Sequence, residues 1–428
     1  MGFSLHEARE DFPYQYAFDL YHPWAIALAR GEAQAPANPY TQTPAYGAFA
    51  GGVAERSTSR SLQAAGRFWQ GRNAQTRFEP TGTPLYYAAL SLLPSDFDRA
   101  HEVMALLQFA ALAAAVVILG RLRRWSWLAC LCAAAFAWAA FNPFTQDVKF
   151  ANAASLQTAC VAALVAAAAR RAWATSRLAD LVYLAALALL ALFKPNTGLI
   201  AACLAMHYAY ARGPWAFLRG AAIAIATSAM AVALSSWVFH DAVIWLDWYR
   251  YVNGANGGTL LYPAADGNLS LVKMLSERAP LHGVTFYSAM AAAVFALIMY
   301  IGLTAMGRES SRLRPGIRAL LDDPWLLASA GVLATFLVAP LVWPHYWVLL
   351  VVPLMRFAGW QGRWDASSVL SIVALAALSR WPLQWLVENA PAAIYVFMLF
   401  SWMPLLPALA MQLARAQRAF RGSPSAIS

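Results

Sequence analysis

The sequence predicts an all-α polytopic membrane protein, and three observations lead to this prediction. Of the 428 residues, 61% are hydrophobic and 12% are charged, whereas soluble domains average about 25% charged residues. Apolar stretches long enough for helices recur along the chain, and arginines are spread unevenly between the stretches that connect them. A soluble protein of this length would need far more polar residues to cover its surface.

The charge balance is basic, with a formal net charge of +10. A basic excess can indicate nucleic-acid binding, but cytoplasmic arginines explain it in a membrane chain, so no nucleic-acid partner is expected. The four cysteines lie inside apolar stretches without metal-ligand spacing, and we interpret them as packing residues: Cys130, Cys132, Cys160 and Cys203.

A bilayer core about 30 Å thick needs roughly 20 helical residues for each crossing. The apolar runs predict a bundle of about 10 to 11 transmembrane helices within residues 103–413. The short pairs around Lys194 and His345 leave the count between nine and eleven. The segments are Val103–Gly120, Ser126–Phe141, Ala153–Ala169, Ala179–Phe193, Thr197–Ala211, Phe217–Trp237, Val284–Met306, Trp325–Trp343, Tyr346–Gly359, Ser367–Trp381 and Ala392–Leu413.

Arginine asymmetry predicts the orientation of this bundle. With residues 1–102 outside, 17 basic residues beyond residue 102 fall on the inner side and six on the outer side. Cytoplasmic loops carry such an excess. We therefore expect a multi-pass protein of a bacterial-type inner or plasma membrane, with an outer loop at 238–283 and a cytoplasmic tail at 414–428.

The N-terminal segment, residues 1–102, is predicted to be a large extracytoplasmic loop. Residues 13–30 have the spacing of an amphipathic helix that lies along the membrane interface, with Trp24 and Tyr21 at headgroup depth. Residues 31–84 have loop composition and no clear period. Because no apolar helix precedes this segment, we expect that one upstream membrane helix is missing from the sequence, and insertion by the first apolar segment is the alternative.

Ionisable and strongly hydrogen-bonding residues lie near the predicted outer ends of helices. Such groups are costly near hydrocarbon, so they face a wet cavity or a partner by default. They are Asp11, Asp147, Lys149, Asn152, Lys194, Asp266, Asn268 and His345.

Two of these residues stand at breaks in apolar helices. Lys194 is followed by Pro195, which ends the helix; this lysine either snorkels to the interface or meets a phosphate or carboxylate at the mouth of a pocket. His345 follows two prolines that exclude a regular helix, so we expect an irregular turn at the outer membrane edge. An aromatic belt is the alternative explanation for its neighbours Trp343 and Trp347.

The chain contains no nucleotide-binding loop, zinc motif or other motif of soluble enzymes. Sugar transfer from a polyprenyl phosphate would fit the polar residues. The departing phosphate needs cationic or hydrogen-bonding stabilisation, as from Lys194 and His345. The acceptor hydroxyl needs one outward carboxylate as a base. The lipid tail of such a donor stays in the bilayer while its head reaches the outer loops.

Six segments in order resemble the GT-C class of membrane glycosyltransferases, and within it glycosyltransferase family 87. Together they span roughly residues 11–355. They are Asp11–Tyr16 (Asp-Phe-x-x-x-Tyr here), Gly31 to Tyr40 (Gly…Pro-Tyr), Phe78–Pro84, Phe193–Pro195 (Phe-Lys-Pro), Gly267–Ser270 (Gly-Asn-Leu-Ser) and Pro340–His345.

The resemblance implies a GT-C-like fold and a polyprenyl-phosphate-mannose or related donor outside the cytoplasm. It implies that Asp11 is the catalytic carboxylate, and Asp19 is the second choice. Lys194 and His345 are expected to bind the donor phosphate, in a single inverting displacement. Residues expected to orient the substrates are Asn152, Asn268, Ser270 and Trp343.

The sequence departs from the family pattern near the last two motifs. Ala339 and Val342 replace serines, Pro344 replaces an acid, Tyr346 replaces a second histidine, and Leu269 replaces a glutamine. The donor sugar is therefore left open. The expected partners are a lipid-linked sugar donor, a glycan or lipid acceptor and membrane lipids. No cofactor is expected, although the binding of a divalent metal through Asp11 or Asp266 is left open. Another polyprenyl-linked transferase or ligase, a transporter or flippase, and a non-catalytic scaffold are the alternatives.

Overall fold

The computed structural model describes residues 17–30, 38–72, 82–253, 269–270, 293, 315–339, 342–358, 365–390 and 393–421. Throughout these ranges the regular structure is helical, and an isolated bridge between Phe141 and Ser379 is the single strand-like pairing recorded there. The predicted all-α class is confirmed for this part of the chain.

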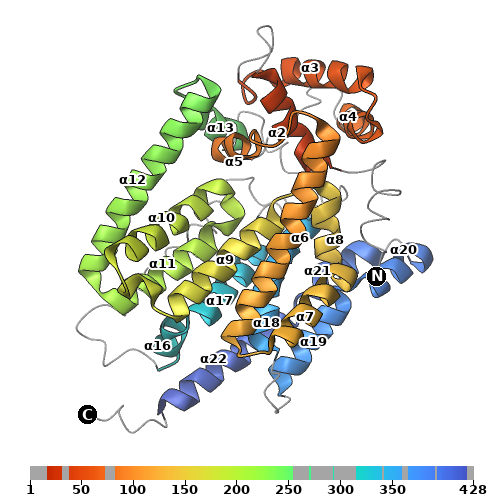
Figure 1. Ribbon diagram of the computed structural model, residues 1–428. Coiled ribbons are helices and arrows are strands. Elements are labelled where there is room, and N and C mark those ends of the chain that lie inside the picture. The colour runs from red at the N-terminus through yellow and green to blue at the C-terminus, as the bar shows by residue number, and fades with distance from the viewer. Residues whose placement is uncertain are drawn as a thin grey trace.

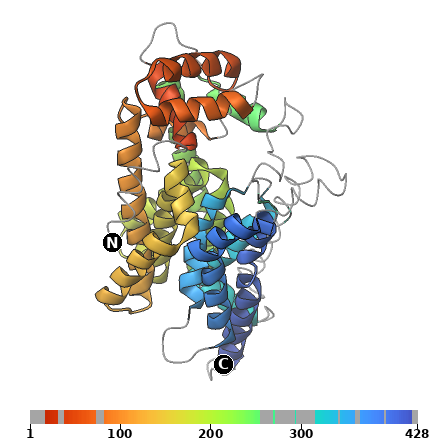
Figure 2. The same ribbon diagram turned by 90° about the vertical axis from the view of Figure 1, so that its right-hand side faces the viewer.

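Five helices form a cluster at one end of the molecule, which we call the outer cluster (Figures 1 and 2). Its apolar side chains form a core of their own, and Trp24 packs edge-on against Phe97 at the start of the first long helix. The helices of the outer cluster are α2 (Phe18–Ala29), α3 (Thr43–Arg56), α4 (Arg60–Arg72), α5 (Pro84–Leu90) and α13 (Ile244–Asn253).

The remaining helices pack into a bundle around a larger apolar core (Figure 1). The two longest, α6 and α12, have 26 residues each. The bundle comprises α6 (Phe97–Leu122), α7 (Trp127–Ala140), α8 (Asn142–Phe150), α9 (Ala154–Ala169), α10 (Arg177–Phe193), α11 (Gly198–Arg212), α12 (Pro214–Phe239), α16 (Pro315–Asp322), α17 (Pro324–Val338), η5 (Pro344–Leu350), α18 (Val351–Phe357), α19 (Ala366–Ala377), α20 (Arg380–Asn389), α21 (Ile394–Ser401) and α22 (Leu405–Arg421), with the short turns η1 (Ala172–Ala174) and η2 (Pro195–Thr197).

Helix starts in the bundle are set by local side chains. Ser126, Ser176 and Asp365 each accept a hydrogen bond from the backbone N–H three residues later, at the starts of α7, α10 and α19. Such caps satisfy donors that a helix leaves unpaired at its first turn. Proline begins α12 and α17, where its missing N–H costs nothing.

Most predicted apolar segments coincide with bundle helices, and several boundaries agree to within three residues, as in α9, α10 and α11. Two segments differ in form. Ala392–Leu413 is divided between α21 and α22, and Tyr346–Gly359 begins as the turn η5 and continues as α18. Segment Val284–Met306 lies outside the described residues except for position 293.

The prediction that residues 31–84 are loop is wrong for the described part, which contains α3 and α4. Helix α3 buries small residues such as Ala50 and Ala54 rather than a stripe of large apolar ones, so its sequence has no strong helical period. The helix predicted at 13–30 is present as α2, but its apolar side chains, including Leu20 and Trp24, are buried in the outer cluster. Helix α2 therefore does not present them to a membrane surface.

Basic and acidic residues meet at the end of the bundle opposite the outer cluster. Arg356 contacts Asp323 at 2.5 Å. The guanidinium of Arg123, just after α6, lies 5.5 Å from the ring centroid of Trp325 and in electrostatic contact with Arg356 and Asp323. Because α6 runs from Phe97 beside the outer cluster to Leu122, these charges lie about 39 Å from that cluster.

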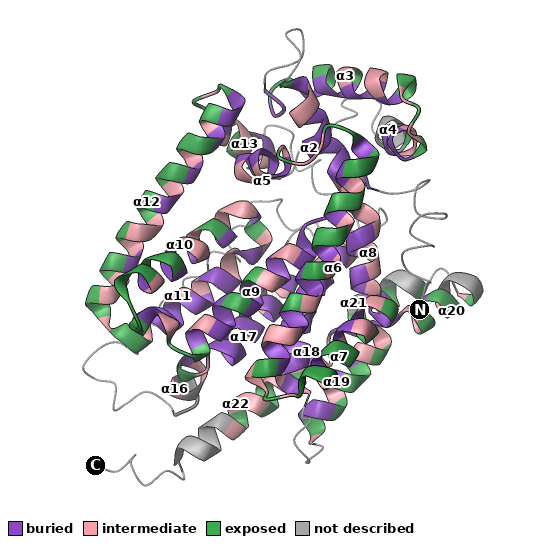
Figure 3. Cartoon of the chain, viewed as in Figure 1, coloured by how far each residue is buried: buried purple, intermediate pink, exposed green. Residues whose placement is uncertain are grey.

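By length and composition, α6 and α12 are the helices in the described ranges that could cross a membrane. Large apolar side chains are exposed along the bundle helices, and Figure 3 marks exposed positions on α6, α7 and α12. Among the described residues of α2 to α5 no large apolar side chain is exposed.

Candidate functional site

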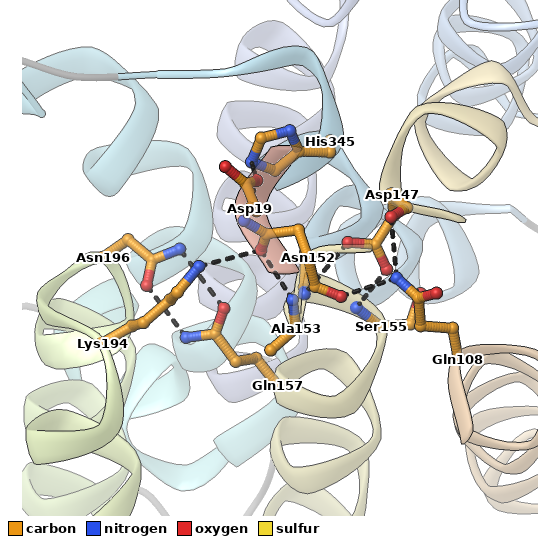
Figure 4. A network of polar contacts seen from close by, with 11 residues as sticks. Asp19, Gln108, Asp147, Asn152, Ala153, Ser155, Gln157, Lys194, Asn196 and His345 are labelled. Atoms are coloured by element: carbon orange, nitrogen blue, oxygen red, sulfur yellow. Dashed lines mark hydrogen bonds and ion pairs between the residues drawn. The ribbon is translucent and has the colours of Figure 1, made fainter. Parts of the chain in front are cut away.

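A polar network lies where the outer cluster meets the bundle (Figure 4). Asp19 comes from α2, Asn152 from the connection between α8 and α9, Lys194 from the break after α10, and His345 from η5. These residues are far apart in the sequence, yet hydrogen bonds and one carboxylate–imidazole contact join them. Four of the residues predicted for the site therefore lie together.

The connection between α8 and α9 positions Asn152. Ala151 ends α8 in the left-handed region, with φ 50°, and turns the chain into Asn152. The backbone N–H of Ala17 donates to the Lys149 carbonyl at 2.6 Å, which ties the start of α2 to the end of α8. This contact brings Asp19 on α2 over Asn152.

Pro195 positions Lys194 by ending α10, as the sequence predicts. The hydroxyl of Thr197 donates to the carbonyls of Leu190 and Lys194 and so satisfies backbone acceptors that the break exposes. The lysine is 7% exposed, so it is buried rather than placed at an open mouth. Its ammonium lies 4.5 Å from the ring centroid of Tyr86 and 5.5 Å from that of Tyr346.

The Asn152 side chain joins Lys194 to Asp19. Lys194 Nζ donates to Asn152 Oδ1 at 2.9 Å, and Asn152 Nδ2 donates to Asp19 Oδ2 at 2.6 Å. Because a lysine ammonium has donors and no acceptor, it fixes the amide oxygen on its own side. The amide N–H₂ must then face the Asp19 carboxylate.

Asp19 is the most exposed of these four residues, and it lies beside the buried His345. His345 Nε2 lies 3.6 Å from Asp19 Oδ2, and the two side chains are 2% and 28% exposed respectively. Burial, followed by the charge of Lys194, holds the pKa of His345 well below its ordinary value, so the imidazole is neutral. Its enclosed position raises the pKa of Asp19, opposed by Lys194 and by the hydrogen bond from Asn152.

Buried polar atoms without a hydrogen-bond partner belong to His345 itself and to Tyr86, whose ring lies against Lys194. Among the residues that the structure describes, neither ring nitrogen of His345 has a hydrogen-bond partner, and the buried hydroxyl of Tyr86 has none either. Buried polar groups in proteins are almost always hydrogen-bonded. A cluster of unpaired groups beside a partly exposed carboxylate is what a binding site for a polar molecule requires.

Asp147 belongs to the same region, but its carboxylate is engaged in capping α9. It accepts hydrogen bonds from the backbone N–H groups of Ala154 and Ser155, at 3.2 and 2.9 Å, and from the Ser155 hydroxyl at 2.5 Å. Burial outweighs these bonds and raises the pKa of Asp147 to about 7. The residue supports the Asn152 connection rather than facing the site.

Gln108 and Tyr86 belong to this region and were not predicted from the sequence. Gln108 Nε2 donates to the carbonyls of Asp147 and Asn152, at 2.7 and 2.6 Å, and thereby pins the Asn152 connection to α6. The available signal was a lone amide in the apolar stretch Val103–Gly120. No spacing in the sequence indicates Tyr86, because it comes from the outer cluster.

The other predicted site residues fall into two groups. Asp11 and Asn268 lie outside the described residues, as does Asp266. Ser270 and Trp343 lie near His345: the Ser270 hydroxyl donates to the Ala339 carbonyl at 2.5 Å, and the Trp343 ring stacks on His345 at 6.5 Å between centroids. Both therefore brace the segment that carries His345.

Within the described ranges, no group of three or more His, Cys, Asp or Glu side chains is placed to hold a metal ion. Comparison with family models, curated proteins and solved structures yields no match to this chain. The chemistry of the site is therefore argued from its residues.

Proposed function

We propose that this protein is a multi-pass membrane glycosyltransferase of GT-C type that transfers a sugar from a polyprenyl-phosphate donor to a glycan or lipid acceptor. Three features support the proposal: the apolar surface of the bundle, the separation of its charges, and the Asp19–His345 pair above a buried lysine. The last of these carries the chemistry.

Helix α12 has the dimensions and surface of a membrane span. Trp215 and Trp237 are 82% and 71% exposed near its two ends, and 22 residues of helix correspond to about 33 Å. This matches a hydrocarbon core of about 30 Å with tryptophan at each interface. Apolar residues such as Ile225 and Met230 are exposed between them.

The distribution of charge supports the predicted orientation. Arg123, Arg356 and Arg415 belong to stretches predicted to be cytoplasmic, and they meet acidic partners at the far end of the bundle. The Asp19 network lies at the opposite end. A transporter is expected to hold its charged groups near the bilayer midplane, so this separation favours an enzyme working at the outer rim.

Asp19 is suited to act as the base. It is the partly exposed carboxylate of the network, and its raised pKa strengthens it as a proton acceptor. Neutral His345 can donate or accept a hydrogen bond at the same place, but it supplies no positive charge. Lys194 supplies that charge from beneath, where burial makes its field stronger than in water.

In the proposed reaction the acceptor hydroxyl oxygen attacks the anomeric carbon of the donor sugar. The bond from that carbon to the phosphate oxygen breaks, and the polyprenyl phosphate leaves as an anion. The proton of the hydroxyl passes to Asp19. Asp11, which the family resemblance implies as the catalytic carboxylate, remains the alternative base.

A donor assay tests this function. Wild-type protein reconstituted in liposomes is incubated with a mixed glycan and lipid fraction as acceptor and with radiolabelled polyprenyl-phosphate hexoses or, in parallel, nucleotide hexoses. We expect consumption of a polyprenyl-phosphate sugar with release of polyprenyl phosphate, and no consumption of nucleotide sugars. Movement of intact lipid-linked sugar across the liposome without cleavage would instead identify a flippase.

A further inference from the structure

The outer cluster contains a second amphipathic helix, α13, whose surface differs from that of α2. Its inner side is buried through Ile244 and Tyr251, whereas Leu246 and Tyr249 are exposed, as is Val243, the residue just before the helix. The exposed residues recur every three positions, so they lie on one face of the helix. Helix α13 therefore keeps the exposed apolar face that the sequence led us to expect of residues 13–30.

The position of α13 identifies what covers this face. Helix α12 ends at Phe239, and residues 240–243 connect it to α13, which lies across the end of the bundle rather than along it (Figures 1 and 2). The exposed apolar surface of α12 reaches Trp237, and that of α13 begins at Val243. The two exposed stretches are thus separated by five residues of the chain, at the point where a membrane-spanning α12 would leave the hydrocarbon.

We propose that α13 is an interfacial helix whose exposed face, formed by Val243, Leu246 and Tyr249, lies in the headgroup region of the outer leaflet. This inference rests on the membrane-spanning arrangement proposed above. A tyrosine, aliphatic side chains and the exposed guanidinium of Arg250 are the residues that such a helix presents to lipid.

Contacts on the inner side of α13 connect it to the Asp19 site. Asn38 Nδ2 donates to Asp241 at 2.6 Å and to Asp247 at 2.9 Å, so one amide holds both ends of the turn into α13. Tyr251 packs against Tyr40, whose hydroxyl donates to the Gly82 carbonyl at 2.8 Å.

The chain of contacts then reaches Lys194. The hydroxyl of Thr83, next to Gly82, donates to the Phe193 carbonyl at 2.9 Å, one residue before the lysine. A helix seated in the headgroups would therefore fix the depth of the site relative to the bilayer. That is the depth at which the phosphate of a lipid-linked donor lies.

Fluorophore depth measurements test the proposal. The exposed thiols are first removed by Cys132→Ala and Cys160→Ala. An environment-sensitive fluorophore is then attached at Leu246→Cys and read in liposomes that contain lipids spin-labelled either near the headgroup or deep in the acyl chain. Ile225→Cys on α12 and Ala48→Cys on α3 are the matched exposed controls.

We expect the label at position 246 to be quenched severalfold more by the shallow lipid probe than by the deep one, and to be shielded from aqueous iodide. The label at 225 should respond most to the deep probe, and the label at 48 to iodide alone. Deep quenching at 225 with iodide quenching at 246 would overturn the inference while leaving the membrane-spanning arrangement intact.

Two further outcomes would also overturn the inference. If neither lipid nor iodide quenches the label at 246, a protein surface covers α13 instead. If the label at 225 responds to iodide and to no lipid probe, α12 is not in a membrane, and the proposed function fails together with this inference.

Discussion

The ammonium of Lys194 and the carboxylate of Asp19 are linked through the single side-chain amide of Asn152. The two hydrogen bonds measure 2.9 and 2.6 Å. Since the lysine only donates, the amide has one orientation, and the Asp19 carboxylate receives a donor from it. A buried charge thereby holds a partly exposed carboxylate in place without contacting it directly.

Replacing Asn152 by leucine should lower kcat about tenfold to a hundredfold, the rate equivalent of a hydrogen bond to a charged group, about 1.5–3 kcal/mol. Without the amide donor the pKa of Asp19 rises further, so the acid limb of the pH–rate profile should move to higher pH. The profile is measured by sugar transfer across pH. A fall in kcat with an unmoved acid limb would mean that Asn152 has only a structural role.

Activity should decline as the pH rises through about 8. Burial lowers the pKa of Lys194 to about 8, although Asp19 and Asp147 oppose the shift, so the lysine loses its charge there. Lys194→Arg stays charged at higher pH. The variant should therefore extend the alkaline limb, with a lower maximal rate because a longer, planar guanidinium does not reproduce the geometry of the hydrogen bond from Lys194 Nζ to Asn152. An alkaline limb still at pH 8 in the variant would exclude Lys194 as its origin.

Asp147 should make stability depend on pH. Its pKa is raised by burial from 3.8 to about 7 in the folded chain, so the folded state binds the proton more tightly than the unfolded state. This contribution to stability is complete below about pH 4 and is lost as the pH rises to 7. Because asparagine does not titrate, the Tm of the wild type should fall relative to that of Asp147→Asn as the pH rises over this range. Thermal unfolding in detergent measures both values. A constant difference would contradict the raised pKa.

Asn38 should be essential for the stability of the outer cluster. Asn38→Leu removes the donor that Asp241 and Asp247 share and should cost about 1–3 kcal/mol in total, because Asp241 still accepts from the Val243 N–H and Asp247 still pairs with Arg250. Asn38→Asp should be at least as harmful, because it adds a third negative charge. Unfolding monitored by proteolysis of the outer cluster measures both variants. Equal stability of wild type and Asn38→Asp would show that the hydrogen bonds from Asn38 to Asp241 and Asp247 are unimportant.

Sequence patterns predicted the bundle better than the outer cluster, for a physical reason. Apolar runs and prolines such as Pro195 act locally, and they gave the ends of α9 to α11 closely. Helix α3 packs through alanine and glycine, which leave no hydrophobic period. The sequence therefore predicts a loop over these residues.

The sequence predicted residues of the site but not the contacts between them. Lys194, Asn152 and His345 were identified as polar residues near helix ends, and Asp19 was the second choice for the catalytic carboxylate. Their linkage through Asn152 depends on contacts across 42 and 133 positions, which no spacing reveals. Lys194 is buried because Tyr86 of the outer cluster covers it. This contact also joins residues far apart in the sequence, so no spacing predicts it.

The most direct test of the proposed site is the transfer rate of Asp19→Asn with a polyprenyl-phosphate sugar, beside Asp11→Asn. Glu102→Gln, an exposed carboxylate on α6, serves as the control. We expect Asp19→Asn to lose at least about a hundredfold in kcat, the lower limit for general-base catalysis, with Tm unchanged and the control fully active. Full transfer by Asp19→Asn, with the loss confined to Asp11→Asn, would contradict Asp19 as the base.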